Sequence, residues 1–263
     1  MLTLIRGAGD IASGIALRLH RAGFDVVMTE IERPTTIRRT VAFSDAVLSG
    51  RQTVEDVTAL RAETWEEACL YLEQGVIPVL VDPDCACRAQ LRPDALVDAI
   101  LAKRNLGTHI DDAPIVVGVG PGFTAGTDCH AVVETMRGHT LGRVYYEGSA
   151  LPNTNVPGLI GGFAGERVLR APADGVFRGT RAIGDRVEAG DTVGFVANVP
   201  MCATISGVLR GLLADGVRVK RGMKSGDVDP RGEADYCALV SDKALSVAGG
   251  VLEAVLHLDA ARK

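Results

Sequence analysis

Aromatic residues are scarce in this 263-residue sequence, and no apolar run approaches the roughly 18 residues of a membrane span. Phe, Trp and Tyr make up 4% of the chain, whereas glycine occurs 31 times, a composition that favours tight turns and closely packed strands. An apolar strand is expected directly at the N-terminus, which leaves no room for a signal peptide. We therefore expect a cytoplasmic protein that does not enter a membrane.

Charge, cysteine content and missing motifs exclude further classes of protein. The net charge of −5 argues against general nucleic-acid binding. Six cysteines in a chain of this length do not make a disulfide scaffold, so we expect reduced thiols. The sequence also lacks the G-x-S-x-G elbow, the Walker A phosphate loop and a Cys–His nucleophile pattern. No motif specifies a reaction.

Residues 2–14 carry the clearest functional signal. A strand-length apolar run is followed by Gly7, Gly9 and Ala12, which fit the G-x-G-x-x-A fingerprint of dinucleotide-binding folds. A helix that begins here would direct free N–H groups and its positive end at a pyrophosphate. The alternative is a scaffold whose glycines serve packing alone.

A second expected strand ends at Glu30, about 20 residues after the glycines, where such folds hydrogen-bond a ribose hydroxyl. A basic segment then contains Arg33, Arg38 and Arg39. Its arginines are predicted either to contact phosphate, which would include a ribose 2′-phosphate, or to form a solvated turn. Glu30 favours a free 2′-hydroxyl instead, so the choice between NAD and NADP stays open.

Residues 115–126 repeat the strand-then-glycine pattern, and consecutive N–H groups in such a loop can form an anion nest. We expect the two loops to meet at the carboxyl ends of adjacent parallel strands, where open α/β sheets bind ligands. The predicted cofactor-binding residues are Gly7, Gly9, Asp10, Ser13, Gly14, Glu30, Gly120, Gly122, Thr124 and Gly126.

Three smaller clusters contain chemically capable side chains. Cys85 and Cys87 lie just beyond an expected strand end, where two thiolates could hold a soft metal, a persulfide or selenium. The alternative is a pair of loop cysteines without function, since no second pair occurs at zinc-finger spacing. Asp98 and Lys103 are predicted to form an ion pair beside the sheet or an acid–base pair with shifted pKa values.

Asp128, His130, Glu134 and His139 are metal-capable residues that follow the second glycine loop. On a strand, the first three would share one face because their spacings are even. We expect them to orient the glycine loop, with metal binding as the alternative.

The C-terminal third consists of short expected strands with frequent turns and contains a repeat offset by 32 residues, from Gly175 to Gly207. Two copies of one β unit are predicted to pack as a small sandwich. Residues 168–230 resemble biotinyl/lipoyl domains, or barrel-sandwich hybrids. The hairpin at residues 198–202 has no lysine to carry biotin or lipoate, so we expect the sandwich to dock, to cover a site or to dimerise.

These patterns predict a Rossmann-like parallel-sheet domain at residues 1–165 and an all-β barrel-sandwich hybrid domain with a C-terminal extension at residues 166–263. In order along the chain, residues 6–14, 97–108, 120–126, 134–139 and 226–231 resemble the YqeB family. That family is associated with selenium-dependent molybdenum hydroxylases.

The resemblance implies an accessory or maturation protein for such hydroxylases. Its expected ligand is a dinucleotide such as NAD(P), or the nucleotide-bearing molybdopterin cofactor. Its expected partners are the hydroxylase or other cofactor-maturation proteins, and a homo-oligomer stays open. The alternative is an NAD(P)-dependent oxidoreductase that acts on a small selenium or sulfur species. No catalytic residue and no metal site is predicted.

Overall fold

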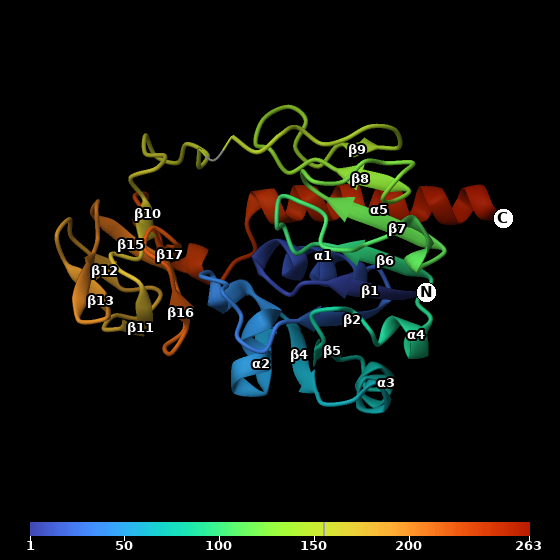
Figure 1. Ribbon diagram of the computed structural model, residues 1–263, viewed down its shortest axis with the longest axis horizontal. Coiled ribbons are helices and arrows are strands. Elements are labelled where there is room, and N and C mark those ends of the chain that lie inside the picture. The colour runs from blue at the N-terminus through green and yellow to red at the C-terminus, as the bar shows by residue number, and fades with distance from the viewer. Residues whose placement is uncertain (155) are drawn as a thin grey trace. The chain divides into compact units, whose positions relative to one another are not determined.

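The computed structural model describes residues 1–154 and 156–263, which form two compact units (Figure 1). Unit 1 comprises Met1–Glu32, Ala42–Thr154 and Val240–Lys263, and unit 2 comprises Arg33–Val41 and Asn155–Leu239. The chain therefore crosses between the units four times. This division differs from the single boundary expected between residues 165 and 166, because one short early segment and the C-terminal helix each pack with the distant part of the sequence.

Unit 1 is built on a nine-stranded sheet with the order β3-β4-β5-β2-β1-β6-β7-β8-β9. The seven inner strands of this order, β4, β5, β2, β1, β6, β7 and β8, pair in parallel. The edge strands β3 and β9 pair antiparallel to their neighbours. Its strands are β1 (Leu2–Arg6), β2 (Asp25–Glu30), β3 (Arg51–Val54), β4 (Val57–Ala62), β5 (Ile77–Val81), β6 (Ala95–Asp98), β7 (Ile115–Val119), β8 (Ala131–Val133) and β9 (Val144–Tyr145).

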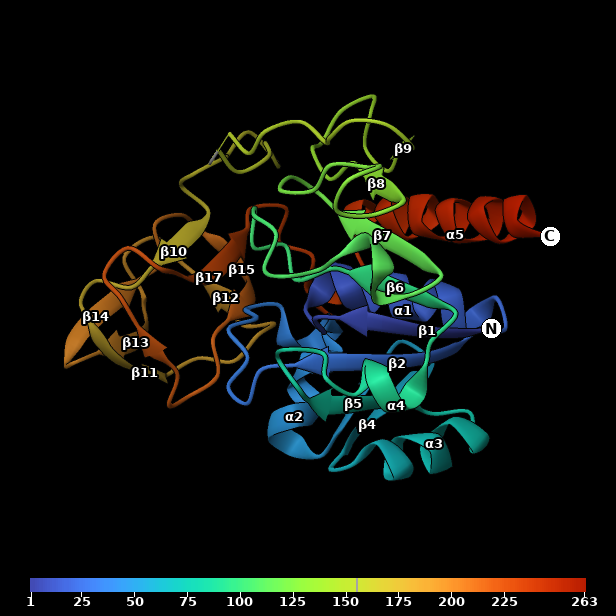
Figure 2. The same ribbon diagram turned by 45° about the vertical axis from the view of Figure 1, so that its right-hand side comes forward.

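Short helices and one long helix surround this sheet (Figure 2). In α3, the Thr64 hydroxyl accepts the Glu67 N–H at 3.2 Å, which is the hydrogen bond of an N-cap residue. The α-helices are α1 (Asp10–Arg21), α2 (Ala46–Ser49), α3 (Trp65–Glu73), α4 (Arg88–Leu91) and α5 (Asp242–Arg262), and the 3-10 turns are η1 (Arg39–Val41), η2 (Phe43–Asp45), η3 (Ile110–Asp112) and η4 (Ala234–Cys237).

The expected Rossmann-like parallel sheet is wrong, because the sheet is mixed. A doubly wound sheet places a helix in its crossovers. The β6–β7 connection, all of whose residues are described, contains only the 3-10 turn η3, and the described β7–β8 connection contains no helix. The antiparallel edge arises because the chain turns at Glu55, whose φ is +54°, so that β3 and β4 form a hairpin.

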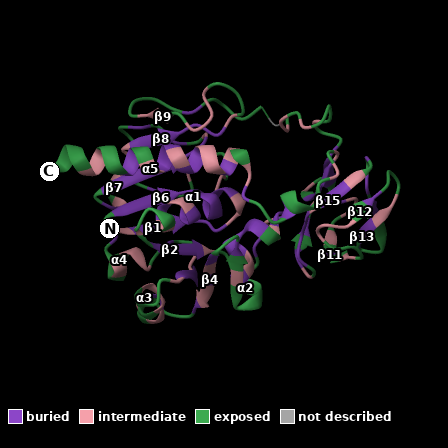
Figure 3. Cartoon of the chain, turned by 180° about the vertical axis from the view of Figure 1, so that it is seen from behind, coloured by how far each residue is buried: buried purple, intermediate pink, exposed green. Residues whose placement is uncertain are grey.

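Helix α5 belongs to the core of unit 1, although it comes from the end of the chain. Ala244, Val247 and Val251 are buried, and the helix packs on α1 and β7. Figure 3 shows that buried and exposed residues alternate along α5. The helical stretch from Ala234 to Arg262 is long and apolar enough to span a membrane by length and composition alone, a test that core helices also pass. The packing of α5 in unit 1 buries these three apolar residues, whereas Leu256 on the same helix is 51% exposed.

Unit 2 consists of two four-stranded antiparallel sheets, with the orders β10-β17-β15-β12 and β14-β13-β11-β16. Gly175 pairs with Val219, and Gly207 pairs with Val187. The two glycines therefore occupy equivalent positions, which confirms the repeat. The strands are β10 (Val168–Arg170), β11 (Gly175–Gly179), β12 (Arg186–Val187), β13 (Thr192–Val196), β14 (Val199–Cys202), β15 (Gly207–Leu212), β16 (Arg218–Val219) and β17 (Lys224–Asp229).

The expected barrel-sandwich hybrid is also wrong as the description of this unit. Strand β10, which lies outside the repeat, completes one of the sheets. Residues 33–41 add a further piece, because Ile37 is buried in the core of the unit and its carbonyl accepts the Leu212 N–H at 2.8 Å. Unit 2 thus combines the repeat with segments from elsewhere in the chain.

Candidate functional site

The carboxyl ends of the parallel strands of unit 1 meet at one edge, which we call the carboxyl edge. From β1 the chain continues through α1 to β2 on one side, whereas from β6 it continues to β7 on the other side. The strand order therefore reverses between β1 and β6. Such a reversal is where open sheets of parallel strands bind ligands.

The loop after β1 requires glycine at its first position. Gly7 has a φ of +96°, and a Cβ at this residue would lie 3.1 Å from the Ala99 carbonyl oxygen and from the Ile100 backbone. Gly9 is the N-cap of α1 and adopts an extended conformation. Glycine has no side chain to cap the helix, and the Ser13 N–H donates to the Gly9 carbonyl at 2.8 Å.

Ser13 and Gly14 contribute to packing inside unit 1 rather than to the carboxyl edge. The Ser13 hydroxyl donates to the Ala8 carbonyl at 3.1 Å and accepts the Phe43 N–H at 2.7 Å. A Cβ on Gly14 would lie 2.8 Å from the Ala244 Cβ, so this glycine lets α5 approach α1. Asp10 is the first residue of α1 and is partly exposed.

Glu30 ends β2 as predicted, but its carboxylate binds the glycine loop. Oε2 accepts the Ala8 N–H at 3.0 Å, and Oε1 accepts the Ile31 N–H at 2.8 Å. Burial raises the pKa of Glu30, and these two hydrogen bonds partly counteract that rise. A ribose hydroxyl would have to share this carboxylate with the backbone.

The second glycine loop follows β7 and packs on the β6–β7 connection. A Cβ on Gly120 would lie 2.9 Å from the Thr135 hydroxyl, and one on Gly122 would lie 2.5 Å from the Arg104 Cα. Exposed Thr124 donates its N–H to the Asp128 carboxylate at 2.8 Å. Asp128 thus orients this loop, as predicted.

The two glycine loops do not follow adjacent strands, which corrects the predicted arrangement. Strand β6 lies between β1 and β7. Gly7 contacts the beginning of the connection after β6, and Gly122 contacts the same connection at Arg104. Residues 99–104 therefore separate the two expected walls. At Gly126, the remaining predicted residue, an added Cβ would meet no atom of the described part of the chain within 4 Å.

Arg6 is the central residue of the carboxyl edge, and it was not among the predicted site residues. Its guanidinium Nη1 donates to the Thr108 hydroxyl at 2.8 Å and lies 3.4 Å from Asp98 Oδ2. Its Nη2 donates to the carbonyls of Pro83 at 3.2 Å and Leu106 at 3.1 Å. One buried side chain thus connects the ends of β1, β5 and β6. The sequence does place a charged residue at the end of an apolar strand, and this pattern could have identified Arg6 as a candidate site residue.

Asp98 is buried beside Arg6, and its partners differ from those predicted. Burial raises the pKa of Asp98, against the opposing effects of the Thr108 hydroxyl, the Ile100 N–H and the charge of Arg6. Its Oδ2 accepts the Thr108 hydroxyl at 2.6 Å. Lys103, the predicted partner, is an exposed residue with a φ of +64°.

The predicted metal-capable residues flank β8 instead of sharing a face of it, because the strand covers only Ala131–Val133. The buried Glu134 carboxylate accepts the N–H groups of Thr135, Met136 and Leu151. His130 Nδ1 accepts the Val116 N–H at 3.0 Å. Among the residues that the structure describes, no three metal-capable side chains come together.

The arginines of the predicted basic arm bind backbone carbonyls within unit 2. Arg33 donates to Gly216 at 3.3 Å, and Arg39 donates to Leu212 at 3.0 Å. Buried Arg38 donates to the carbonyls of Tyr236 and Leu239, both at 3.1 Å. These contacts give the arginines a structural role in attaching residues 33–41 to unit 2.

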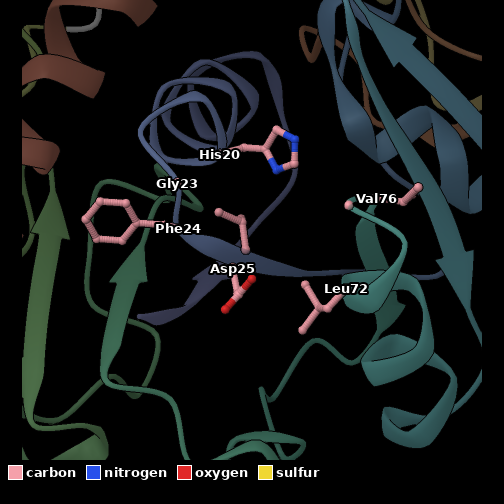
Figure 4. Close-up of a pocket in the computed structure, with 8 residues that line it drawn as sticks. His20, Gly23, Phe24, Asp25, Leu72 and Val76 are labelled. Carbon is pink, nitrogen blue, oxygen red and sulfur yellow. The ribbon is translucent and has the colours of Figure 1, made fainter.

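A shallow depression of about 180 Å³ lies at the opposite, amino-terminal end of the strands (Figure 4). Asp25, which begins β2, lines it together with His20, Phe24 and Leu72. This depression is separate from the glycine loops, since those follow the carboxyl ends of the strands. It contains none of the predicted site residues.

Comparisons with known proteins find one curated relative and several distant structures, and no family model matches the chain. Two similar solved structures are an aspartoacylase family protein from Mesorhizobium loti (11% identical, TM-score 0.27, 86% of this chain and 84% of that chain) and a succinylglutamate desuccinylase/aspartoacylase from Rhodobacter sphaeroides (13% identical, TM-score 0.26, with the same coverage). Overlaps this low define neither fold nor activity.

The curated relative is the uncharacterized protein YqeB of Escherichia coli (strain K12), which is 54% identical over 257 residues. The match covers 98% of this chain but only 48% of the relative, so the chain spans about half the length of the relative it matches. The chain is therefore similar to one part of YqeB along nearly its whole length.

Proposed function

We propose that the chain is an accessory protein for selenium-dependent molybdenum hydroxylases, and that unit 1 binds a dinucleotide or the nucleotide-bearing molybdenum cofactor at its carboxyl edge. The observation that carries the proposal is the start of α1. The helix begins at Asp10, with Gly9 as its N-cap, shortly after β1 and beside the reversal of strand order. An N-terminus without a capping side chain favours an anionic group such as a phosphate.

Two residues at this edge, Gly9 and Glu30, bear on how a phosphate would bind. Gly9 presents no Cβ to an approaching anion, which is the role that the fingerprint assigns to it. The carboxylate of Glu30 is bonded to Ala8, the residue just before Gly9. A phosphate would therefore bind the first-turn N–H groups of α1, and Glu30 would hold the loop in shape.

An oxidoreductase that uses NAD(P) is the less favoured alternative. Such an enzyme needs a proton-transferring group that reaches its substrate. Asp98 is the acid at the reversal point, but it is 2% exposed and bonded to Thr108 and Arg6. The edge therefore offers better support for binding than for redox catalysis on a bound nucleotide.

Calorimetry with NAD, NADP and cytidine diphosphate tests the binding step. We expect the wild-type chain to bind at least one of them and Gly9→Val to bind it about a hundredfold more weakly, which corresponds to about 2.8 kcal/mol. Gly165→Val is the matched control, because a Cβ there would meet no described atom within 4 Å. The proposal fails if the wild type binds none of the nucleotides, or if Gly9→Val binds as tightly as the control.

Mass spectrometry of the protein purified under mild conditions tests which ligand it carries. A co-purifying nucleotide that bears a pterin would support the maturation role. The accessory role itself predicts that the wild-type chain increases cofactor loading of a molybdenum hydroxylase and that Gly9→Val does not. Equal loading with both variants would contradict it.

A further inference from the structure

Cys85 and Cys87 lie in a rigid turn after β5. The Cys85 N–H donates to the Asp82 carbonyl at 3.1 Å, and the Cys87 N–H donates to the Asp82 carboxylate at 2.8 Å. Arg88 donates to the Cys85 carbonyl at 3.0 Å. With the backbone held in this way, the two thiols form a hydrogen bond with each other.

The two sulfur-bearing side chains differ in their access to solvent. Cys85 is 1% exposed and belongs to the core of unit 1, whereas Cys87 is partly exposed and packs at the border of that core. Cys85 also has a φ of +56°, in the left-handed region that residues with a side chain rarely adopt. Backbone strain of this kind occurs preferentially at functional sites.

Their surroundings give the two thiols opposite properties. The hydrogen bond from Cys87 is the main cause that lowers the pKa of Cys85, and the charge of Arg6 and the Thr29 hydroxyl lower it further, against burial and the charge of Asp82. The pKa of Cys87 is raised by its hydrogen bond to Cys85, by burial and by the charges of Cys85 and Asp82. Of the two thiols, Cys85 therefore loses its proton more readily, and Cys87 holds its proton more strongly.

We propose that Cys85 and Cys87 form a redox-active dithiol that a hydroperoxide converts into an intrachain disulfide. A thiolate in contact with a second, protonated thiol is the arrangement of a redox-sensing pair with its resolving cysteine. A metal site has less support, because three metal-capable side chains meet nowhere in residues 1–154 and 156–263. The proposal does not depend on nucleotide binding.

The reaction has two steps. The Cys85 thiolate attacks one oxygen of the hydroperoxide, and the O–O bond breaks to leave the sulfenic acid of Cys85 and an alkoxide or hydroxide, which takes up the proton that Cys85 released. The Cys87 sulfur then attacks the Cys85 sulfur, the S–O bond breaks, and water leaves with the Cys87 proton. In sum, two thiols and one organic hydroperoxide give one disulfide, one alcohol and one water. With hydrogen peroxide, the products are one disulfide and two waters.

Burial of Cys85 selects small oxidants. Because Cys85 is 1% exposed, we expect an oxidant as small as hydrogen peroxide to react with it, whereas glutathione disulfide needs room for a second peptide. Because the two sulfurs already contact each other, the disulfide requires only the shift that brings them to bonding distance.

The test uses the full-length reduced protein treated with hydrogen peroxide, followed by peptide mapping. We expect the peptide with both cysteines to lose two hydrogen atoms, about tenfold faster than the exposed thiol of Cys202 is oxidised in the same sample. In Cys87→Ala, dimedone should trap the sulfenic acid of Cys85. Cys69→Ala is the control and should behave as the wild type does.

Three results would overturn the proposal. The first is that the pair in the wild type is oxidised no faster than Cys202. The second is that the wild type forms a sulfenic or sulfinic acid but no disulfide. The third is faster reaction with glutathione disulfide than with peroxide, which would identify a thiol–disulfide exchange site instead. The wild-type measurement alone decides each of them, so it does not depend on how the variants fold.

Discussion

Arg6 and Asp98 stand opposite each other in the register of β1 and β6 and form a buried ion pair at the point where the strand order reverses. Arg6 is 6% exposed and Asp98 is 2% exposed. Thr108 bonds to both side chains. The pair connects three loops of the carboxyl edge, so its loss should affect both stability and the shape of the candidate site.

Arg6→Met should destabilise unit 1 by about 3–5 kcal/mol, because it leaves the Asp98 carboxylate buried without its charge partner. Unfolding in urea measures this loss. Adding Asp98→Asn to Arg6→Met should recover part of it, since the unpaired charge is then removed. Arg21→Met is the matched control. Its pair with Glu55 is exposed, and the expected cost is about 0–1 kcal/mol. A similar loss in both arginine variants would contradict this account.

Gly14→Ala should destabilise unit 1 by about 1–3 kcal/mol, because the added Cβ would lie 2.8 Å from the Ala244 Cβ and would force α1 and α5 apart. Thermal unfolding is the measurement. Gly249→Ala on α5 serves as the control, since its Cβ would meet only the Arg18 guanidinium at 3.9 Å. That variant should leave the unfolding temperature unchanged or raise it, because alanine favours the helix.

Gly207→Ala should destabilise unit 2 more than Gly175→Ala, although the two glycines are equivalent in the repeat. A Cβ on Gly207 would lie 2.3 Å from the Asp229 carbonyl oxygen, whereas a Cβ on Gly175 would come no closer than 3.0 Å, to the Ala197 Cβ. We expect a difference of about 1 kcal/mol or more in the free energy of unfolding. Equal effects would show that the two copies have the same packing tolerance.

Asp229 should make unit 2 sensitive to acid. Burial acts to raise its pKa, but the hydrogen bonds from Arg231 and the charges of Arg210 and Arg231 outweigh burial and hold the pKa below its ordinary value of 3.8. The carboxylate therefore contributes stability that is present above this value and is lost as the pH falls through the lower pKa of the folded state.

Unfolding measured from neutral pH down to about pH 2 tests this contribution. Asp229→Asn should be less stable than the wild type at neutral pH and should lose less stability below pH 3.8. An unchanged slope in the variant would assign the acid sensitivity to other carboxylates.

Local patterns in the sequence predicted many elements correctly. The apolar runs at Leu2–Arg6 and Ile115–Val119 are buried strands. The repeat between Gly175 and Gly207 is confirmed by their equivalent pairing. These features depend on residues close together in the sequence, or on a match between two copies, so they can be read without knowledge of the fold.

Contacts between distant segments decided the rest. The fold class was wrong because periodicity within a segment does not show that a neighbouring strand runs antiparallel at a sheet edge. Gly14 fits a nucleotide fingerprint by its position, yet Ala244 lies against it. Arg6 looked like the end of a strand, and only the loops after β5 and β6 give it its partners.

The sequence by itself indicated the two glycine turns, the start of α1 and the chemically capable side chains, because backbone conformation and residue type are local properties. The tertiary structure alone decided what those side chains do. In the folded chain, Glu30 accepts a hydrogen bond from the backbone of the glycine loop, and Asp98 pairs with Arg6. The thiols of Cys85 and Cys87 lie together, and the charge of Arg6 lowers the pKa of Cys85. Burial and electrostatic partners come from residues far apart in the chain, and they set the charge and reactivity of each group.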